Sequence, residues 1–302
     1  MPLSPSPIRW PVEAIWQAVS PQLPGFTCEV LPEIDSTNTE LLRRFKSGRP
    51  EPTLLVAEQQ TAGRGRLGRQ WHSQRGDSLT FSLGLALQPV DWSGLSLAVG
   101  ISLAESLNPA LAADRSIGLH IGLKWPNDLW LCSPDGERKL AGILVETASW
   151  EGQRYVVIGV GINISAKVLA TVADASSGTS ANNRSSPDVS PMPPAALQEL
   201  IHAIDAPAAL LRVVAPLLQT VQAFAQFGFA PFQARFARRD VLAGRSVTVL
   251  DGKKQLEGSA HGVAASGALL VHTADGMKEI TSSEVSVRPA AMRRPIKQVP
   301  AC

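Results

Sequence analysis

A series of short apolar segments between residues 27 and 164 constrains the fold of this chain more than any other feature. Each segment has the length and the bounding turn residues of a buried strand. The segments are Thr27–Ile34, Thr53–Glu58, Ser78–Leu87, His120–Trp125, Asp128–Cys132, Lys139–Thr147 and Tyr155–Ile164. Helical spacing of apolar residues occurs between them only after Asp35 and over Gly94–Leu107. Because strands outnumber helices, we predict an α+β fold with a mixed β-sheet rather than a doubly wound one.

Changes of composition along the chain predict its domains. We expect a lead over residues 1–26 with one short helix, a main domain over 27–239, a small β-domain over 240–289 and a basic tail over 290–302. The small domain is predicted from short strands separated by Gly turns, a pattern typical of a small β-barrel. Within the main domain, the Ser- and Pro-rich residues 166–195 offer too little apolar surface to offset their ordering entropy, which predicts a flexible insertion.

Charge and cysteine content argue against several classes of function. The 302 residues include 28 Lys and Arg and 26 Asp and Glu, a net charge of +2, which disfavours nucleic-acid binding through bulk charge. The three cysteines, Cys28, Cys132 and Cys302, are far apart and form no C-x-x-C pair. Neither a disulfide framework nor a structural zinc site is therefore expected, and scattered thiols are typical of a reducing compartment.

The sequence does not predict a membrane or export segment. The longest apolar runs, near Leu95–Ala104 and Val156–Ile164, are shorter than the roughly 18 residues that a spanning helix needs. The opening MPLSPSPIRW contains three prolines and lacks the apolar core of a signal peptide. We therefore expect a cytoplasmic protein with no membrane partner.

The loop Gly63–Arg69 has the sequence GRGRLGR and matches the pattern G-x-G-x-x-G. In a dinucleotide-binding loop the glycines lead into a helix, whereas QWHSQRGD and then a predicted strand follow here. A kinase loop is disfavoured because the chain has no H-R-D and no D-F-G. Glycines let the backbone approach a ligand closely, and arginine forks bind carboxylates and phosphates. The loop therefore predicts an anion-binding site, the alternative being a solvated surface loop.

Other candidate residues lie beside this loop or at strand ends. Trp71 is either a core anchor or a face on which a base stacks. In KWPND, residues 124–128, the proline breaks the strand and leaves Asn127 to bind a polar ligand. Lys139 begins an apolar strand, where it is either a charge beside a ligand or a solvated strand end. The glycines of GVGIN, residues 159–163, lie inside an apolar strand and indicate close approach of a ligand.

Together these motifs resemble the biotin protein ligases. DSTN, EQQTAGRGRLGRQW, KWPND, RKLAGILVE and GVGIN follow in the family's order within residues 27–164, and GFAPFQARFARRD with the small β-domain extends the similarity more weakly over 227–289. The resemblance implies a mixed sheet related to class II tRNA synthetases and lipoate ligases, followed by an SH3-like barrel. It implies two reaction steps: biotin and ATP give biotinyl-5′-adenylate and pyrophosphate, and biotin then passes to one lysine of a biotin carboxyl carrier domain.

The resemblance also implies roles for residues of this chain. Arg66 and Lys139 are implied as the catalytic pair, because biotin's carboxylate and the α-phosphate of ATP repel each other. The implied biotin-binding residues are Ser36, Thr37, Asn38, Gln60, Arg64, Gly65, Arg66, Lys139, Gly142 and Gly161. The implied ATP- and adenylate-binding residues are Arg64, Arg66, Arg69, Trp71, Lys124, Asn127, Lys139 and Asn163. Mg²⁺ is implied together with ATP, and its ligands are left unassigned.

Two other functions stay open on the sequence. A lipoate ligase or octanoyltransferase shares the fold, although the full GRGRLGR loop favours biotin. A biotin carrier module would use Lys278 in GMKE, a faint echo of a carrier hairpin. Some biotin protein ligases carry an N-terminal DNA-binding domain, and residues 1–26 are too few for one, so we expect no specific DNA binding. A homodimer is compatible with the resemblance.

Overall fold

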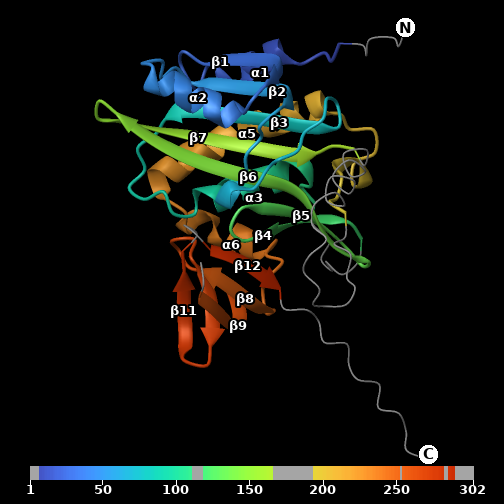
Figure 1. Cartoon of the computed structure of the whole chain (residues 1–302), viewed down its shortest axis with the longest axis vertical. Coiled ribbons are helices and arrows are strands. Elements are labelled where there is room, and N and C mark those ends of the chain that lie inside the picture. Colours follow the sequence, from blue (N-terminus) through green and yellow to red (C-terminus); the bar gives the residue numbers. More distant parts are fainter. Residues whose placement is uncertain (1–6, 111–117, 166–192, 252–253, 282–284, 290–302) are drawn as a thin grey trace, which may run out of the picture.

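The computed structural model describes residues 7–110, 118–165, 193–251, 254–281 and 285–289. Within them, the chain forms a seven-stranded sheet and a separate five-stranded sheet. Figure 1 shows the larger sheet with its helices above and the smaller sheet, β8 to β12, below. The predicted insertion lies outside the described residues except for 193–195. Of these three, Ala195 is fully buried and belongs to the core, so the prediction was wrong at that end.

The large sheet contains all seven predicted strands. They are β1 Thr27–Ile34, β2 Thr53–Gln60, β3 Ser78–Ala86, β4 His120–Lys124, β5 Asp128–Ser133, β6 Gly136–Trp150 and β7 Gln153–Asn163. The order across the sheet is β1-β2-β3-β7-β6-β5-β4. Only β1 and β2 run parallel, while the other neighbours are antiparallel. This confirms the predicted mixed sheet. β6 is longer than expected because it pairs with β5 at its start and with β7 up to the hairpin turn.

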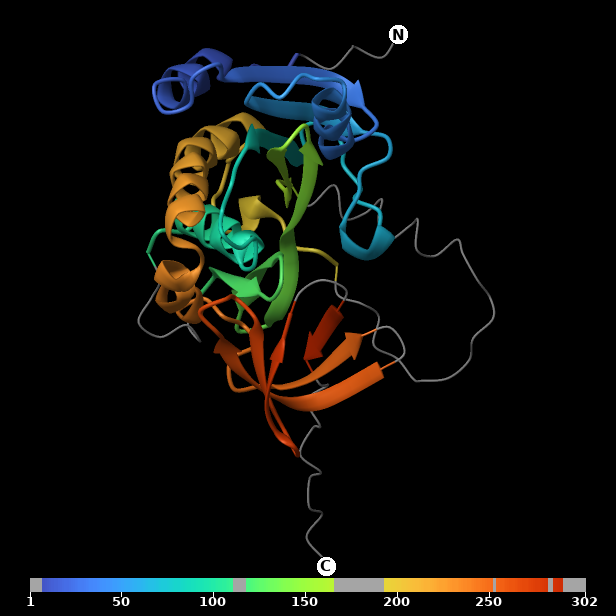
Figure 2. The same ribbon diagram turned by 90° about the vertical axis from the view of Figure 1, so that its left-hand side faces the viewer.

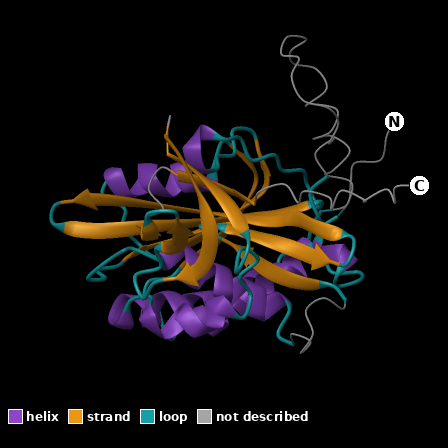
Figure 3. Cartoon of the chain, turned by 90° about the horizontal axis from the view of Figure 1, so that it is seen from below, coloured by secondary structure: helices purple, strands orange, loops and turns teal. Residues whose placement is uncertain are grey.

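Helices cover both faces of the large sheet. The helices are α1 Val12–Val19, α2 Thr37–Lys46, α3 Leu95–Leu107, α5 Ala206–Phe227 and α6 Gln233–Ala237. Figure 2 shows α3 and α5 stacked against one face, and the main core lies between them and the sheet. Figure 3 shows helices on both sides of the strands. The second face carries α2, which packs through Leu41 and Phe45 on Leu55, Tyr155 and Val157.

Helix α5 is apolar along most of its length and lies within residues 195–239, whose pattern predicts helix. Its 22 residues are apolar and long enough to cross a membrane, yet half of its most apolar window is buried inside the fold. It packs against α3 and α1. Ten of its side chains, including Leu210, Val213 and Leu217, are buried. These contacts are those of a core helix that covers a sheet.

The small sheet is antiparallel throughout. Its strands are β8 Ser246–Asp251, β9 Lys254–Val263, β10 Leu269–Thr273, β11 Gly276–Ile280 and β12 Val285–Pro289, in the order β11-β10-β9-β8-β12. This agrees with the predicted small β-structure of SH3-like type.

The small sheet is attached to the strands of the large sheet that carry KWPND. The indole Nε1 of Trp125, whose side chain is 1% exposed, donates to the carbonyl of Gly267 at 3.0 Å. Gly267 has φ +83°, and a Cβ there would lie 2.7 Å from Cα of Gly94, so this turn requires glycine. Arg245, just before β8, forms an ion pair with Glu137 on β6 at 2.5 Å. The small sheet therefore fixes the end of the large sheet where Trp125 lies.

We expect Trp125→Phe to lower the free energy of unfolding, because the buried carbonyl of Gly267 loses its donor. This loss should amount to about 1–3 kcal/mol in addition to the loss caused by the smaller side chain. Trp130→Phe is the matched control, since Nε1 of Trp130 is buried without a hydrogen-bond partner. Urea denaturation of the full chain measures both variants. Equal losses in the two would show that the bond to Gly267 contributes nothing.

Candidate active site

The floor of the main pocket is a glycine-rich patch on the face of the sheet that carries α2. Alternation along β7 puts Tyr155, Val157, Gly159 and Gly161 on this face. Tyr155 and Val157 pack under α2, whereas Gly159 and Gly161 line the pocket. In register, Gly159 lies opposite Ser82 on β3 and Leu144 on β6. The same strand thus supplies apolar bulk beneath the helix and open space beyond it.

One end of the pocket carries a network of neutral polar groups, which we call the polar end: Ser36, Thr37, Asn38, Gln60 and Ser82. The first three begin α2, where the Ser36 hydroxyl accepts a bond from the N–H of Thr39 as the N-cap. The N–H and hydroxyl of Thr37 donate to Oε1 of Gln60 at 2.8 and 3.1 Å. The Ser82 hydroxyl lies 2.6 Å from both Thr37 Oγ1 and Asn38 Oδ1. These bonds fix the orientation of each side chain.

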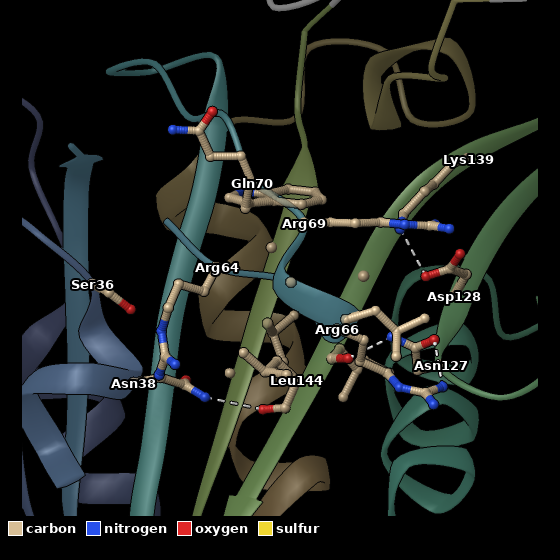
Figure 4. Close-up of a pocket in the computed structure, with 18 of the residues that line it drawn as sticks. Ser36, Asn38, Arg64, Arg66, Arg69, Gln70, Asn127, Asp128, Lys139 and Leu144 are labelled. Carbon is tan, nitrogen blue, oxygen red and sulfur yellow. Dashed lines mark hydrogen bonds and ion pairs between the residues drawn. The ribbon is translucent and has the colours of Figure 1, made fainter. Parts of the chain in front are cut away.

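Asn38 is held on all sides. Its Nδ2 donates to the carbonyl of Leu144 at 3.2 Å and to Oε2 of Glu146 at 2.9 Å. A Cβ at Gly159 would lie 2.1 Å from Oδ1 of Asn38, so only glycine leaves room for this amide. Figure 4 shows Asn38 turned toward Leu144 with the guanidinium of Arg64 beside it. Both amide hydrogens are thereby used, and Oδ1 retains a lone pair for a ligand.

The Gly-Arg loop closes over the pocket as a tight turn. Arg64 and Gln70 form an isolated antiparallel bridge, and the N–H of Gly65 donates to the carbonyl of Arg69 at 2.7 Å. Between them lies a short 3₁₀ turn, Arg66–Gly68, in which Leu67 has φ +57°. Arg64 forms an ion pair with Glu146 at 2.8 Å. The loop is therefore bonded to the sheet at its base, and its tip is exposed.

The opposite end of the pocket, the cationic end, carries Arg66, Arg69, Lys124 and Lys139. Nζ of Lys139 donates to Oδ1 of Asp128 at 2.8 Å. Nη1 of Arg66 lies 3.4 Å from Oδ1 of Asn127, whose Nδ2 is held by the carbonyl of Ile143 at 2.8 Å. Figure 4 shows Arg66, Arg69 and Lys139 converging on this side, away from Ser36 and Asn38.

Burial makes Arg66 an unusual cation. Desolvation lowers the pKa of its guanidinium, the charge of Asp128 opposes that shift, and the charge of Arg69 adds to it. An arginine stays protonated at neutral pH even when its pKa is lowered. Its charge is thus partly removed from water, which strengthens its attraction to any anion that enters.

Trp71 closes the pocket from above the glycine floor. A Cβ at Gly161 would lie 2.3 Å from Cε2 of the indole, and a Cβ at Gly142 would lie 3.6 Å from its Cζ3. Its buried Nε1 has no hydrogen-bond partner. The indole therefore covers the floor between the polar and cationic ends, and its stacking on adenine stays a prediction.

The structure brings together nearly all the residues that the sequence singled out. Every predicted biotin- or nucleotide-binding residue lines this pocket except Asn163. Asn163 is buried, and its Nδ2 donates to the carbonyl of Ala195 at 3.1 Å. Arg75, the further arginine after the loop, pairs with Glu58 outside the lining.

Sequence reasoning missed Ser82, Glu146 and the pairing of Asp128 with Lys139. Ser82 could have been singled out in the sequence, because it is a polar residue inside an apolar strand. Glu146 ends the RKLAGILVE motif, and only the strand register shows that it lies opposite Val157, next to α2.

The described residues contain no group of three or more His, Cys, Asp or Glu able to hold a metal ion. Asp128 is the one carboxylate among the described residues that line the pocket. Magnesium in nucleotide sites is usually held by phosphates, waters and one or two carboxylates. The donor set therefore fits an ion that enters with a polyphosphate rather than one held by the protein alone.

A polar end, a glycine floor and a cationic end are what a ligand with a polar head, an apolar chain and an anionic tail requires. Residues 30–163 match the model of the biotin/lipoate A/B protein ligase family, and residues 243–288 match that of the biotin protein ligase C-terminal domain. The bifunctional ligase/repressor BirA of Escherichia coli is 36% identical over 276 residues, covering 89% of this chain and 76% of that protein. This chain belongs to the biotin protein ligase family.

A further relative and a solved structure support membership of this family. The biotin–[acetyl-CoA-carboxylase] ligase of Paracoccus denitrificans is 31% identical over 261 residues, 85% of this chain and 98% of that protein. The structure of the biotin protein ligase from Aquifex aeolicus in complex with biotin and ATP is similar with a TM-score of 0.64 and 28% identity, over 87% of this chain and 99% of that one. These matches favour a biotin ligase over the lipoate ligase and carrier alternatives.

Proposed function

We propose that this biotin protein ligase joins biotin to ATP, releases pyrophosphate, and transfers biotin from the adenylate to one lysine of a biotin carboxyl carrier domain. The observation that carries the proposal is a single pocket with the polar end and the cationic end on opposite sides of a glycine floor. Biotin has a urea at one end and a carboxylate at the other, so the two ends match its two polar groups.

The polar end suits a urea, which offers two N–H donors and one carbonyl acceptor. The Asn38 amide can offer a ligand only its acceptor Oδ1, because both hydrogens on Nδ2 are bonded within the protein. It is therefore the partner for a urea N–H. Oε1 of Gln60 is bonded to Thr37, so its Nε2 and the hydroxyl of Ser36 are the donors for the urea oxygen.

The cationic end suits the adenylation step. An oxygen of the biotin carboxylate attacks the α-phosphorus of ATP, and the bond from that phosphorus to the bridging oxygen of pyrophosphate breaks. Both reactants are anions, and negative charge grows on the phosphate oxygens. Arg66 and Lys139 are placed to stabilise that charge without moving far. The ammonium of Lys139 has three N–H donors, so its bond to Asp128 leaves donors for biotin and for the phosphate.

Magnesium belongs to this proposal as a companion of ATP. When bound it screens the phosphate charge, and Asp128 together with phosphate oxygens would hold it. Arg69, Lys124 and Asn127 would contact the nucleotide beside it. The glycine floor and the cover given by Trp71 keep water from the mixed anhydride.

Four further proposals concern the acceptor protein, the oligomeric state, DNA binding and the cellular location. We propose that the carrier domain of a biotin-dependent carboxylase is the acceptor, and that a homodimer forms in solution, which light scattering tests. We propose that this chain does not bind DNA specifically, since its net charge of +2 offers little bulk attraction to phosphates. A cytoplasmic location is supported by ATP as substrate and by three cysteines that are far apart and form no C-x-x-C pair, as is typical of a reducing compartment.

Calorimetric titration of biotin and of lipoate, each with and without ATP and Mg²⁺, tests the proposed function. We expect biotin to bind alone and to release pyrophosphate when ATP is present, while lipoate gives neither signal. Binding of lipoate but not biotin would show that the chain acts as a lipoate ligase instead. Binding of neither by folded protein would refute an adenylating function.

A further inference from the structure

Glu146 is a half-buried link between two walls of the pocket, although it does not line the pocket itself. Its side chain is 25% exposed and lies on β6, two residues beyond Leu144. Both of its oxygens accept from Nη2 of Arg64, at 2.9 and 2.8 Å, and Oε2 also accepts from Nδ2 of Asn38 at 2.9 Å. One carboxylate thus joins the strand, the start of α2 and the base of the Gly-Arg loop.

The first consequence concerns the orientation of Asn38. An amide can rotate by half a turn and exchange its oxygen and nitrogen, and the two orientations offer a ligand opposite hydrogen bonds. A carboxylate only accepts, so Glu146 requires the nitrogen on its side and leaves Oδ1 facing Ser82 and the pocket. Glu146 therefore strengthens, together with the carbonyl of Leu144, the orientation in which Asn38 accepts a bond from a urea N–H.

The second consequence concerns the charge of Arg64. Its guanidinium is 45% exposed and is balanced by Glu146. Arg64 also forms the bridge with Gln70 that begins the Gly-Arg loop. A carboxylate bonded to it fixes the base of the loop and reduces the charge that Arg64 offers to an anion. Arg64 thereby serves the polar end, whereas the cationic end relies on Arg66 and Lys139.

We propose that Glu146 is a positioning residue for biotin recognition: it orients Asn38 toward the urea and anchors the Gly-Arg loop through Arg64. The proposal rests on the proposed function, because it concerns how the same pocket recognises biotin. It assigns Glu146 to the affinity for biotin and not to the nucleotide or to the chemical step.

The test compares Glu146→Gln with wild type by calorimetry of biotin without ATP and by biotin-dependent exchange of pyrophosphate into ATP. The variant keeps the shape of the side chain but loses the charge and one acceptor. Loss of hydrogen bonds to a charged group predicts a Kd and a KM for biotin raised roughly tenfold or more. The KM for ATP and the kcat should change less than about twofold, because the cationic end is untouched.

Glu105→Gln is the matched control. Glu105 on α3 accepts from Arg235 with both oxygens, at 3.2 and 2.5 Å, and lies outside the pocket. Its loss should leave the biotin constants unchanged while removing a comparable ion pair. If Glu146→Gln and Glu105→Gln both leave biotin affinity unchanged, or if Glu146→Gln raises the two KM values equally, the positioning role is refuted.

A double-mutant cycle separates positioning from general stability. If Glu146 acts through Asn38, Glu146→Gln should weaken biotin binding further by less than about threefold once Asn38→Ala is present. If the effects of the two substitutions on the free energy of biotin binding add fully, the inference is wrong. Failure of the proposed function is distinguishable, since wild type itself would then fail to bind biotin.

Discussion

Lys139→Ala and Arg66→Ala are expected to lose adenylate formation while the fold stays intact. Each removes a cation from the cationic end, where two anions must meet and where negative charge grows in the transition state. Removing one preorganised donor of this kind lowers the rate by about 10²–10³-fold. Lys139 is bonded to Asp128 at 2.8 Å, so its loss also leaves a carboxylate facing the phosphates. Biotin-dependent exchange of pyrophosphate into ATP measures the loss.

Arg138→Ala is the control for both variants. Arg138 precedes Lys139 on β6 and forms an ion pair with Glu199 outside the pocket. Removing this largely solvent-screened pair should change the exchange rate by less than roughly threefold. Circular dichroism and thermal unfolding establish that the variants are folded. A near-normal exchange rate in Lys139→Ala or Arg66→Ala would break the assignment of these two side chains to the chemical step.

The sheet, the glycine floor and the Gly-Arg loop could be predicted from local patterns, whereas the biotin-binding roles of Ser36, Thr37, Asn38 and Gln60 came only from the resemblance to the biotin protein ligases. A glycine inside an apolar strand is unfavourable unless something needs the space, and Gly159 and Gly161 do form the floor. Arginines that alternate with glycines have few ways to pack without an anion, and Arg64, Arg66 and Arg69 do line the pocket. Local chemistry therefore indicated where a ligand approaches.

What could not be predicted depends on pairing between distant segments. Asn163 lies on the same face of β7 as Gly161, yet its amide donates to the carbonyl of Ala195, which lies 32 residues further along the chain. Glu146 reaches Asn38 and Arg64 only because of the order of β3, β7 and β6 in the sheet. Neither the order nor the register of these strands can be derived from the spacing of residues within one strand.

Gly159→Ala should weaken biotin binding strongly without touching any atom of the cationic end. A Cβ at this position would lie 2.1 Å from Oδ1 and 2.8 Å from Cγ of Asn38, so the amide must leave its place. It then loses its bonds to Ser82, Leu144 and Glu146, and the polar end loses its fixed acceptor. A urea N–H left without its acceptor costs about 1–3 kcal/mol, so at about 1.4 kcal/mol per tenfold change biotin binding weakens roughly ten- to hundredfold. Calorimetry with biotin measures this.

The added methyl group also destabilises the fold, by about 1–3 kcal/mol for an overpacked site. Gly84→Ala controls for that effect, because a Cβ at Gly84 would lie 2.4 Å from the hydroxyl of Tyr155, in the core beneath α2 and outside the pocket. It should lose similar stability and keep biotin affinity. Adding Asn38→Ala to Gly159→Ala should restore stability but not affinity, since the clash disappears together with the acceptor. Wild-type affinity in Gly159→Ala would mean that biotin does not depend on Asn38.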